Sequence, residues 1–542
     1  FLMKNNLLTV LGFYLLFAFQ VTKAQSNDTL AVNQLGALIN ADGSLFQGEF
    51  PDYYSLRFPV NNPISHNLVY AGGYWLAADN TSVGGNLHVA ATMFAEQGEN
   101  DFSHGPVADV YDSAYDSRYN RVWTVTQEQI NQHIVLYQTS GYVMPEVIAT
   151  WPAHGNTDNN EPAYLAPFID VNNDGWYQPQ LGDYPAIKGD KAIFYIVNDA
   201  RFPHASGGAA FNVDMLNMVY AYHVPSDPFL QHSVFLSSRL VNRSSQTYLP
   251  VLGMWLDADV GIPSNDVTGC DTLLNVTFAY NRDSIDQTGF DNRPPALGCI
   301  LLNHSLYTHV HTYNNFNTLG NPSEPEHYYR LLHGLKKDNT PIFYGGNGFT
   351  GTVPTRYMYS GNPATGEGWI AIAPGALSGS LDIRTMAVAE PFTFLPGQSI
   401  CFDWAFTVAQ APLAATLPHL EAVSVLKNYT QQVHNWYNAN IQNCPVEPLI
   451  TGIETTPNRG FIKLYPNPAQ NQLLLSVQSD HLQLAQLYVY HANGCMALQQ
   501  TQNLTQGENI IELWVNRLPA GMYFVEVLMG KHVWRTRLLK KD

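Results

Sequence analysis

The chain has 542 residues, only 13% of them charged, and its formal net charge at pH 7 is −18. More than one globular unit is expected at this length, and the acidic balance argues against nucleic-acid binding, because phosphates are recognised by basic surfaces. Aromatic residues make up 12% of the chain, and 40 Gly and 33 Pro interrupt it, a composition that favours short strands and long loops over helical bundles.

The first predicted element is a secretory signal peptide over residues 1–24. Lys4 supplies a positive charge, Leu7 to Phe19 form an apolar run, and small residues precede a cleavage point after Ala24. The run is short for a membrane span, which favours a cleaved signal over an anchor. We therefore expect export, with a mature chain that begins at Gln25.

The exported passenger is predicted to be mainly β, with a multi-domain β-sandwich architecture and long loops. Segments rich in β-branched and aromatic residues follow one another at the spacing typical of a sandwich or barrel. One helix is predicted near the end of the passenger, from Leu417 to Ile441, because apolar residues recur there at helical spacing. We divide the passenger into an N-terminal β-rich region, 25–165, and a main β-rich region, 166–444. The expected strands are 70–79, 86–96, 191–199, 218–224, 233–242 and 275–281.

The five cysteines are few for a chain of this length. Export permits disulfides, and an odd number leaves at least one cysteine without an intramolecular partner. The first expected pairs are Cys270 with Cys299 and Cys401 with Cys444, which leaves Cys495.

The segment from Phe168 to Pro185, FIDVNNDGWYQPQLGDYP, carries the oxygen-rich pattern D-x-N-x-D-G. Calcium takes about six to eight hard oxygen ligands, and such a tight loop turns its side chains to one side. An EF-hand would need Glu where this chain has Leu181, and Asp183 is the nearest substitute. The alternative is a set of Asx turns that cap their own backbone. We favour a calcium loop between strands, with the candidate ligands Asp170, Asn172, Asp174, the Trp176 carbonyl and Asp183.

A second acidic cluster lies between Trp255 and Asp271. Its polar groups would repel one another unless a cation or solvent separated them, so a second calcium site is a hypothesis here. The alternative is a hydrolytic site with paired carboxylates drawn from Asp257, Asp259 and Asp266, because glycosidases use two carboxylates about 5–10 Å apart. We favour the cation, with the candidate ligands Asp257, Asp259, Asn265, Asp266 and Asp271.

Histidines gather between residues 304 and 333 without a zinc-binding pattern. The alternation of His309 and His311 would place both rings on one strand face, but neither HExxH nor a third ligand at a diagnostic spacing is present. We expect these and His304, His327 and His333 to be surface and loop histidines. Since GxSxG, P-loop and dinucleotide motifs are also absent from the sequence, no catalytic motif is assembled and enzymatic activity is disfavoured.

The composition changes after Cys444. Residues 445–460 are predicted to be a linker that carries proline and threonine, and a separate module of about 80 residues follows. Its expected strands are 473–478, 485–494, 510–515, 521–528 and 532–539.

The motifs YPNP (465–468), LYVYHANG (487–494) and LPAGMYFVEV (518–527) and a basic last strand make residues 461–542 resemble the type A C-terminal sorting domain of the type IX secretion system. That family is an immunoglobulin-like β-sandwich in Bacteroidota. The resemblance implies passage through the type IX translocon and its sorting machinery, and then a secreted or outer-membrane surface location, with lipopolysaccharide as one anchor. The motif residues are Tyr465, Pro466, Asn467, Pro468, Gly494, Pro519, Gly521 and Tyr523.

The passenger resembles, from about Gly43 to Cys444, a group of large secreted Bacteroidota proteins. The motifs that carry this resemblance include GGYWLAA, NLHVAATMF, WPAHGN and GMWLDADVG; it implies secretion and no particular chemistry. The low charge, the abundance of tyrosine and asparagine, the cation-loop patterns and the lack of an assembled catalytic motif lead us to expect a calcium-stabilised, non-enzymatic protein of adhesion, matrix or glycan contact. A secreted polysaccharide hydrolase and a structural subunit of a surface filament are the alternatives.

Overall fold

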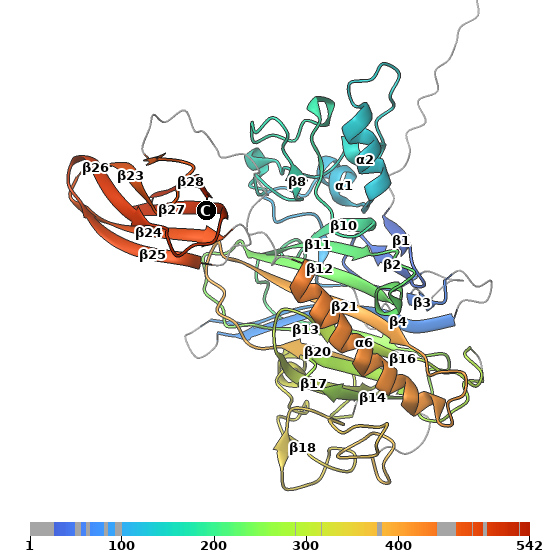
Figure 1. Cartoon of the computed structure of the whole chain (residues 1–542). Helices are drawn as coiled ribbons and strands as arrows, with labels where there is room; N and C mark the ends of the chain where they lie inside the picture. Colours follow the sequence, from blue (N-terminus) through green and yellow to red (C-terminus); the bar gives the residue numbers. More distant parts are fainter. Residues whose placement is uncertain are drawn as a thin grey trace, which may run out of the picture.

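Figure 1 shows the computed structural model of the chain. The expected signal peptide, the expected linker, Cys444, Gly494 and Cys495 lie outside the described residues. The structure describes residues 26–48, 56–60, 66–80, 85–92, 100–287, 289–315, 317–376, 382–441, 462–479, 481–491, 496–529 and 532–541.

Two large antiparallel sheets build the passenger. The eight-stranded sheet has the order β1 (Asn27–Ala31), β2 (Gly36–Asn40), β3 (Leu56–Phe58), β4 (His66–Asp79), β13 (Val251–Ala258), β20 (Ile383–Ala389) and β17 (Leu306–Tyr313), with β5 (Leu87–Ala91) beside β4. The nine-stranded sheet has the order β14 (Asp266–Asp271), β15 (Val276–Asn281), β16 (Ala296–Leu301), β21 (Ser399–Ala409), β12 (Ser233–Asn242), β11 (Val213–Ala221), β10 (Lys191–Asn198) and β6 (Ser103–His104), with β7 (Trp123–Thr126) beside β10. Expected strands 191–199 and 233–242 are β10 and β12.

The two sheets face each other across a shared apolar core. Met254 of β13 and Phe406 of β21 belong to one buried cluster. The rings of Tyr74 and Trp404, one from each sheet, lie 6.3 Å apart, and the Tyr74 hydroxyl is 2.7 Å from the Ser238 hydroxyl of the facing sheet. Each fully buried large apolar side chain stabilises the fold by about 1.5–3 kcal/mol. The mainly β, sandwich-type fold class is therefore confirmed.

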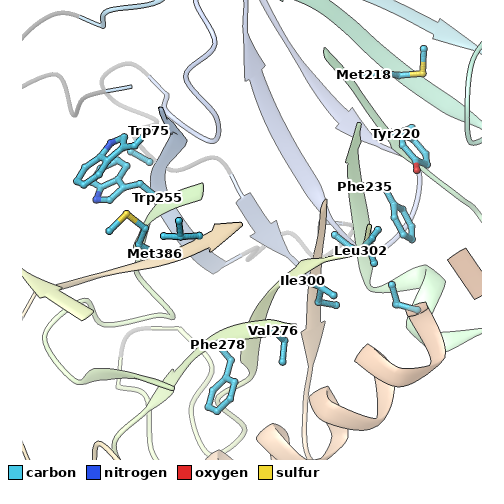
Figure 2. Packing of buried hydrophobic residues seen from close by; sticks show 14 of the residues in the cluster. Trp75, Met218, Tyr220, Phe235, Trp255, Val276, Phe278, Ile300, Leu302 and Met386 are labelled. Atoms are coloured by element: carbon cyan, nitrogen blue, oxygen red, sulfur yellow. The ribbon is translucent and has the colours of Figure 1, made fainter. Parts of the chain in front are cut away.

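Helices cover the outward faces of both sheets. Helix α6 (Pro418–Asn440), which confirms the helix expected over 417–441, crosses the nine-stranded sheet (Figure 1). On the other sheet, Tyr328 of α5 (Pro325–Leu332) contacts Trp75 edge-on at 4.8 Å between ring centroids, and Trp75 stacks on Trp255 at 5.9 Å. Figure 2 shows this outer packing, with Trp75, Trp255 and Met386 in one group. Strands that are covered on both faces carry long apolar runs, as the sequence does.

Short helices that the sequence analysis did not predict fill the loops. Thr126 and Gln129 form a reciprocal capping box at the start of α2, and Asp112 caps α1, so local start signals were present in the sequence. Elements this short give too little periodicity to be recognised. They are α1 (Ser113–Tyr119), α2 (Gln127–Leu136), α3 (Glu146–Ala149) and α4 (Pro228–Gln231), with 3₁₀ turns Thr157–Asn159 and Pro179–Leu181. No helix in the described ranges is both long and apolar enough to cross a membrane.

Long-range pairing joins the two regions into which we divided the passenger. Strand β4, before residue 165, pairs with β13, after it. Strands β6 and β7 likewise pair with β10. Both sheets therefore draw strands from either side of residue 165.

The expected disulfide between Cys270 and Cys299 is wrong, since both cysteines are buried and free. Thr277 of β15 lies between them, in register with Cys270 on one side and Cys299 on the other. Two strand spacings separate the cysteines by about 9–10 Å, beyond the roughly 7 Å that a disulfide spans between Cα atoms. Cys401 is disulfide-bonded. Cys444 and Cys495 both lie outside the described residues, so the expected pair of Cys401 with Cys444 stays a prediction.

The C-terminal module is a separate small sandwich. One sheet has the order β22 (Ile462–Tyr465), β23 (Gln472–Ser479) and β26 (Gly507–Trp514), and the other β25 (Met496–Leu504), β24 (Gln483–His491), β27 (Gly521–Met529) and β28 (His532–Lys540). Buried residues alternate along the strands, as in Leu473, Leu475 and Val477, and those of both sheets form one cluster. This period of two is what a sheet with one covered face requires.

Candidate functional site

The D-x-N-x-D-G segment forms a closed loop. Strands β8 (Phe168–Ile169) and β9 (Tyr184–Pro185) pair and bring residues 170 and 183 together at its base. Asn173 and Gly175 have φ values of 58° and 83°, a left-handed conformation that Asn and Gly adopt at the lowest cost. The loop therefore lies between strands, as the sequence analysis expected.

The two carboxylates at the base are buried and accept backbone hydrogen bonds. Asp170 accepts from the amides of Asn173 and Gly175 at 2.6 and 2.7 Å. Asp183 accepts from those of Val171 and Gln178 at 2.8 and 2.7 Å. Burial raises the pKa of Asp183, and these two hydrogen bonds oppose the rise. These bonds are the ones that the Asx-turn alternative requires, while each oxygen keeps a further lone pair for a cation.

The tip of the loop is exposed. The Asn172 amide nitrogen donates to Asp174 Oδ2 at 2.8 Å, and the Trp176 backbone N–H donates to Asp174 Oδ1 at 2.9 Å. The Trp176 ring lies 5.2 Å from the His154 ring and is 61% exposed. Among the five predicted ligands, Asp170 and Asp183 thus lie at the base of the loop and the other three at its tip.

The second acidic cluster takes a different form from the one the sequence suggested. Asp257 lies near the end of β13, a register shift follows it, and Asp259 comes just after the strand. Asp382 precedes β20, and its carboxylate meets theirs, with one oxygen from each of the three residues within 4.8 Å of the others. Arg384 lies 3.0 Å from both Asp257 and Asp382. The sequence analysis missed Asp382 and Arg384 because they are more than 100 residues from β13.

Charge and burial conflict in this cluster. Asp257 and Asp259 are 3% and 6% exposed, and among the described residues neither Asp257 Oδ1 nor Asp259 Oδ1 has a hydrogen-bond partner. Burial raises the pKa of Asp257 to about 7, against the attraction of Arg384. Burial and the neighbouring Asp257 also raise the pKa of Asp259.

The other three predicted ligands, Asp266, Asp271 and Asn265, do not belong to this three-carboxylate cluster. Asp266 is buried and accepts the backbone N–H of Val260 at 2.9 Å. Asp271, at the far end of β14, makes an ion pair with Lys427 at 3.0 Å. Asn265 has both amide atoms buried without a hydrogen-bond partner in the described part of the chain.

Two of the histidines contradict their expected surface position. His309 and His311 of β17 are fully buried. His311 Nδ1 lies 3.0 Å from the Thr268 hydroxyl across the sandwich, and His309 Nδ1 lies 3.2 Å from the Met386 carbonyl. Burial lowers the pKa of His309 to about 4 and that of His311 to about 3. His309 and His311 alternate because they lie on one buried face of strand β17, whereas we expected them in an exposed loop.

A buried cationic histidine also escaped the sequence analysis. His204 Nδ1 lies 2.5 Å from the Val89 carbonyl, and His204 Nε2 lies 2.7 Å from the Asp199 carbonyl. Because carbonyls only accept, both ring nitrogens must carry protons. Burial alone would lower the pKa of His204, but the Asp199 and Asp101 carboxylates, each 3.8 Å away, raise it. The imidazolium thus lies between two buried acids and offsets one of their two negative charges.

The sorting-motif residues that the structure describes hold the terminal module together. Asn467 Oδ1 accepts the Leu539 N–H of β28 at 2.9 Å. Tyr465 ends β22, and Pro466 and Pro468 flank Asn467 in the bend that follows. The buried Tyr523 of β27 donates its hydroxyl to the Pro519 carbonyl at 2.8 Å, and Gly521 begins that strand. The motifs therefore fix the entry to the module and one strand start.

One comparison with known proteins concerns this module, and two others extend over more than half of the chain. Residues 463–541 match the family model described as a secretion system C-terminal sorting domain. The chain is similar to a polysaccharide lyase structure at 8% identity and a TM-score of 0.18, covering 60% of this chain and 34% of that one. It is also similar to dimeric latent PorU from Porphyromonas gingivalis, at 7% identity and a TM-score of 0.13, covering 65% and 31%. The chain thus spans about a third of each, and such scores carry no functional argument. No curated protein matches the sequence.

Proposed function

We propose that this chain, whose residues 463–541 are a secretion system C-terminal sorting domain, carries a non-enzymatic, calcium-stabilised passenger that contacts glycans or matrix. The sorting domain implies interaction with the type IX secretion machinery and a secreted or cell-surface protein. Lipopolysaccharide is the anchor we propose where the passenger stays on the outer membrane.

The observation that carries the glycan contact is the exposed Trp176 ring at the tip of loop 170–183. Val171 and Leu181 of the same loop are also about half exposed, and the polar side chains of Asn172 and Asp174 lie between them in sequence. An exposed aromatic face next to hydrogen-bonding groups suits a sugar ring, which offers C–H faces and hydroxyls. The four backbone hydrogen bonds at the loop base hold this surface in place before any ligand arrives, which lowers the entropic cost of binding.

Calcium would act on the same loop. Asp170, Asp174 and Asp183 each offer oxygen lone pairs beyond those used by backbone amides, and hard oxygen donors suit calcium. A bound ion would reduce the repulsion that Asp170 and Asp174 exert on Asp183. The ion's role here is to stiffen the loop that presents Trp176.

A hydrolase that uses Asp257 and Asp259 is the second candidate. The raised pKa of Asp257, about 7, favours it, because a general acid needs such a value. Against it, both carboxylates are nearly inaccessible, and Asp257 is held by Arg384, whereas a glycosidase places its two carboxylates on either side of an accessible bond.

A filament subunit is less favoured because one sheet edge is covered. The His309 N–H at the β17 edge donates to the Arg356 carbonyl at 3.0 Å, and the Met358 N–H donates back to His309 at 3.1 Å. An edge capped in this way offers few free groups for strand addition.

The test begins with location. The full chain and a version without residues 463–541 are expressed in a host with a type IX system, and the passenger is followed by surface proteolysis and in the medium. The full chain should reach the surface or medium, and the truncated chain should stay inside the cell. Equal export of both would overturn the assignment of the terminal module. A mobility shift that depends on lipopolysaccharide synthesis would support the proposed anchor.

Binding is then measured with the exported protein on a glycan array, with and without EDTA. Trp176→Ala should weaken binding at least tenfold, while Tyr344→Ala, which removes another exposed aromatic side chain, should leave it unchanged. Equal binding by wild type and Trp176→Ala would contradict the proposal. Release of soluble sugar without a metal requirement would support the hydrolase instead.

A further inference from the structure

The carboxylates of Asp257, Asp259 and Asp382 have too little positive charge beside them to balance all three. If all three are ionised, they and the Arg384 guanidinium carry a net charge of −2 in a site where Asp257 and Asp259 are almost fully buried. Uncompensated charge in the interior is costly, and proteins relieve it by protonation, by pairing or by metal coordination.

Two oxygens in this group have no hydrogen-bond partner in the described part of the chain. Asp257 uses Oδ2 for Arg384, at 3.0 Å, and there leaves Oδ1 buried without a partner. Asp259 Oδ1 is likewise buried without a partner among the described residues. Buried polar atoms nearly always have a partner, and exceptions indicate an ion or water that belongs to the site.

We infer that Asp257, Asp259 and Asp382 hold one calcium ion in the passenger, in addition to any ion in loop 170–183. Calcium lies about 2.3–2.6 Å from its oxygen ligands, so oxygens that share one ion are at most about 5 Å apart. The three carboxylate oxygens lie within 4.8 Å of one another and meet that limit. This inference deepens the calcium part of the proposed function and names the residues of a second site.

The donor set selects the kind of ion. All three ligands are carboxylates, which prefer hard cations, and a histidine or cysteine that would favour zinc is not among them. Magnesium demands octahedral geometry and keeps several waters, which suits a site with two nearly inaccessible carboxylates less well than calcium does. One divalent ion balances the charge of −2.

Arg384 is a positioning residue in this arrangement. Its guanidinium spans Asp257 and Asp382 from one side, and Arg384 faces Asp257 in the β13–β20 register. The ion would therefore tie the end of β13 to the segment that enters β20. Extracellular calcium-binding modules have Kd values of about 10⁻⁴–10⁻³ M, and we expect a Kd in the same range for this site.

The test uses the full exported protein after EDTA treatment and dialysis. Calcium stoichiometry is measured by equilibrium dialysis, and the melting temperature is recorded from zero to about 10 mM CaCl₂, ten times the upper end of the expected Kd range. Asp382→Asn should lose one bound ion or weaken it at least tenfold, with a smaller calcium-dependent rise in Tm, because the ion stabilises only the folded state. Asp382 is the choice because its side chain is 39% exposed, so its replacement perturbs packing least.

Three controls make the result decisive. Asp271→Asn, whose carboxylate pairs with Lys427, should bind calcium like wild type. Asp174→Asn should affect only the loop ion, so the two sites can be counted separately. If Asp382→Asn fails to fold, Asp382→Glu, which keeps the charge, must retain the ion.

Wild-type stoichiometry and affinity in Asp382→Asn would overturn the inference, as would wild-type protein that binds no ion outside loop 170–183. Glycan binding tests the proposed function separately. If Asp382→Asn loses the ion but still binds glycans, both proposals stand. If Trp176→Ala loses glycan binding but keeps both ions, the loss concerns the ligand surface alone.

Discussion

The two acidic regions of the passenger satisfy their carboxylates in opposite ways. In loop 170–183 the partners come from the loop itself, since Asp170 and Asp183 accept backbone amides within 12 residues. In the other region, Asp257, Asp259 and Asp382 are assembled by sheet pairing, and a single Arg384 serves them. A run of acids that is close in sequence can cap its own backbone, whereas Asp257 and Asp382 have the Arg384 side chain as their partner.

The largest expected effect comes from Arg384→Met in calcium-free protein. It removes the guanidinium that pairs with Asp257 and Asp382, and breaking a buried ion pair on one side costs about 3–5 kcal/mol. Urea unfolding measures the loss. Arg121→Met is the control, because its partner Glu146 is 55% exposed, and such pairs contribute at most about 1 kcal/mol. Equal losses in the free energy of unfolding for the two variants would mean that the buried pair of Arg384 and Asp257 stabilises the fold no more than the exposed pair of Arg121 and Glu146.

Asp183→Ala should cost about 3 kcal/mol, since it leaves the N–H groups of Val171 and Gln178 without their carboxylate acceptor in a buried position. Faster hydrogen exchange at those two amides would locate the damage. Asp174→Ala at the exposed tip should cost roughly 1 kcal/mol or less. If both variants lose the same free energy of unfolding, the loop is not held from its base.

His204 shows a third arrangement, in which an internal imidazolium lies between Asp101 and Asp199 and offsets one of their two charges. Its pKa is raised in the folded protein, so its stabilisation is complete below the unfolded pKa, about 6.5, and is lost as pH rises through the higher folded pKa. We expect wild-type Tm to fall on the order of 2 °C more than that of His204→Asn between pH 6 and 9. Parallel pH profiles of Tm would show that the ring does not carry this charge.

The smallest effect is expected at the loop turn. Gly175→Ala forces a left-handed conformation at φ 83°, where the nearest atom to an added Cβ is the Tyr164 hydroxyl at 3.7 Å. The cost is therefore conformational, about 1 kcal/mol. Gly175→Asn should lose less, because Asn tolerates this conformation. Thermal melts of the two variants compare them directly, and a larger loss in Asn would indicate crowding instead.

The sequence by itself determined the features whose causes are local. Alternating and β-branched runs predicted β10 and β12, helical spacing predicted α6, and the motifs around Tyr465 and Tyr523 predicted the sorting domain. The D-x-N-x-D-G loop followed from neighbouring residues as well, because its turns and caps need partners only a few positions away.

Tertiary structure alone decided which distant groups meet. Asp382 joins Asp257 only because β20 pairs with β13. His204 is cationic because the Asp199 and Asp101 carboxylates lie beside it and the Asp199 and Val89 carbonyls accept from its two nitrogens. Cys270 and Cys299 remain apart because β15 lies between their strands. Strand order depends on the packing of the whole core, and the charge state of a buried group depends on neighbours that local patterns do not specify.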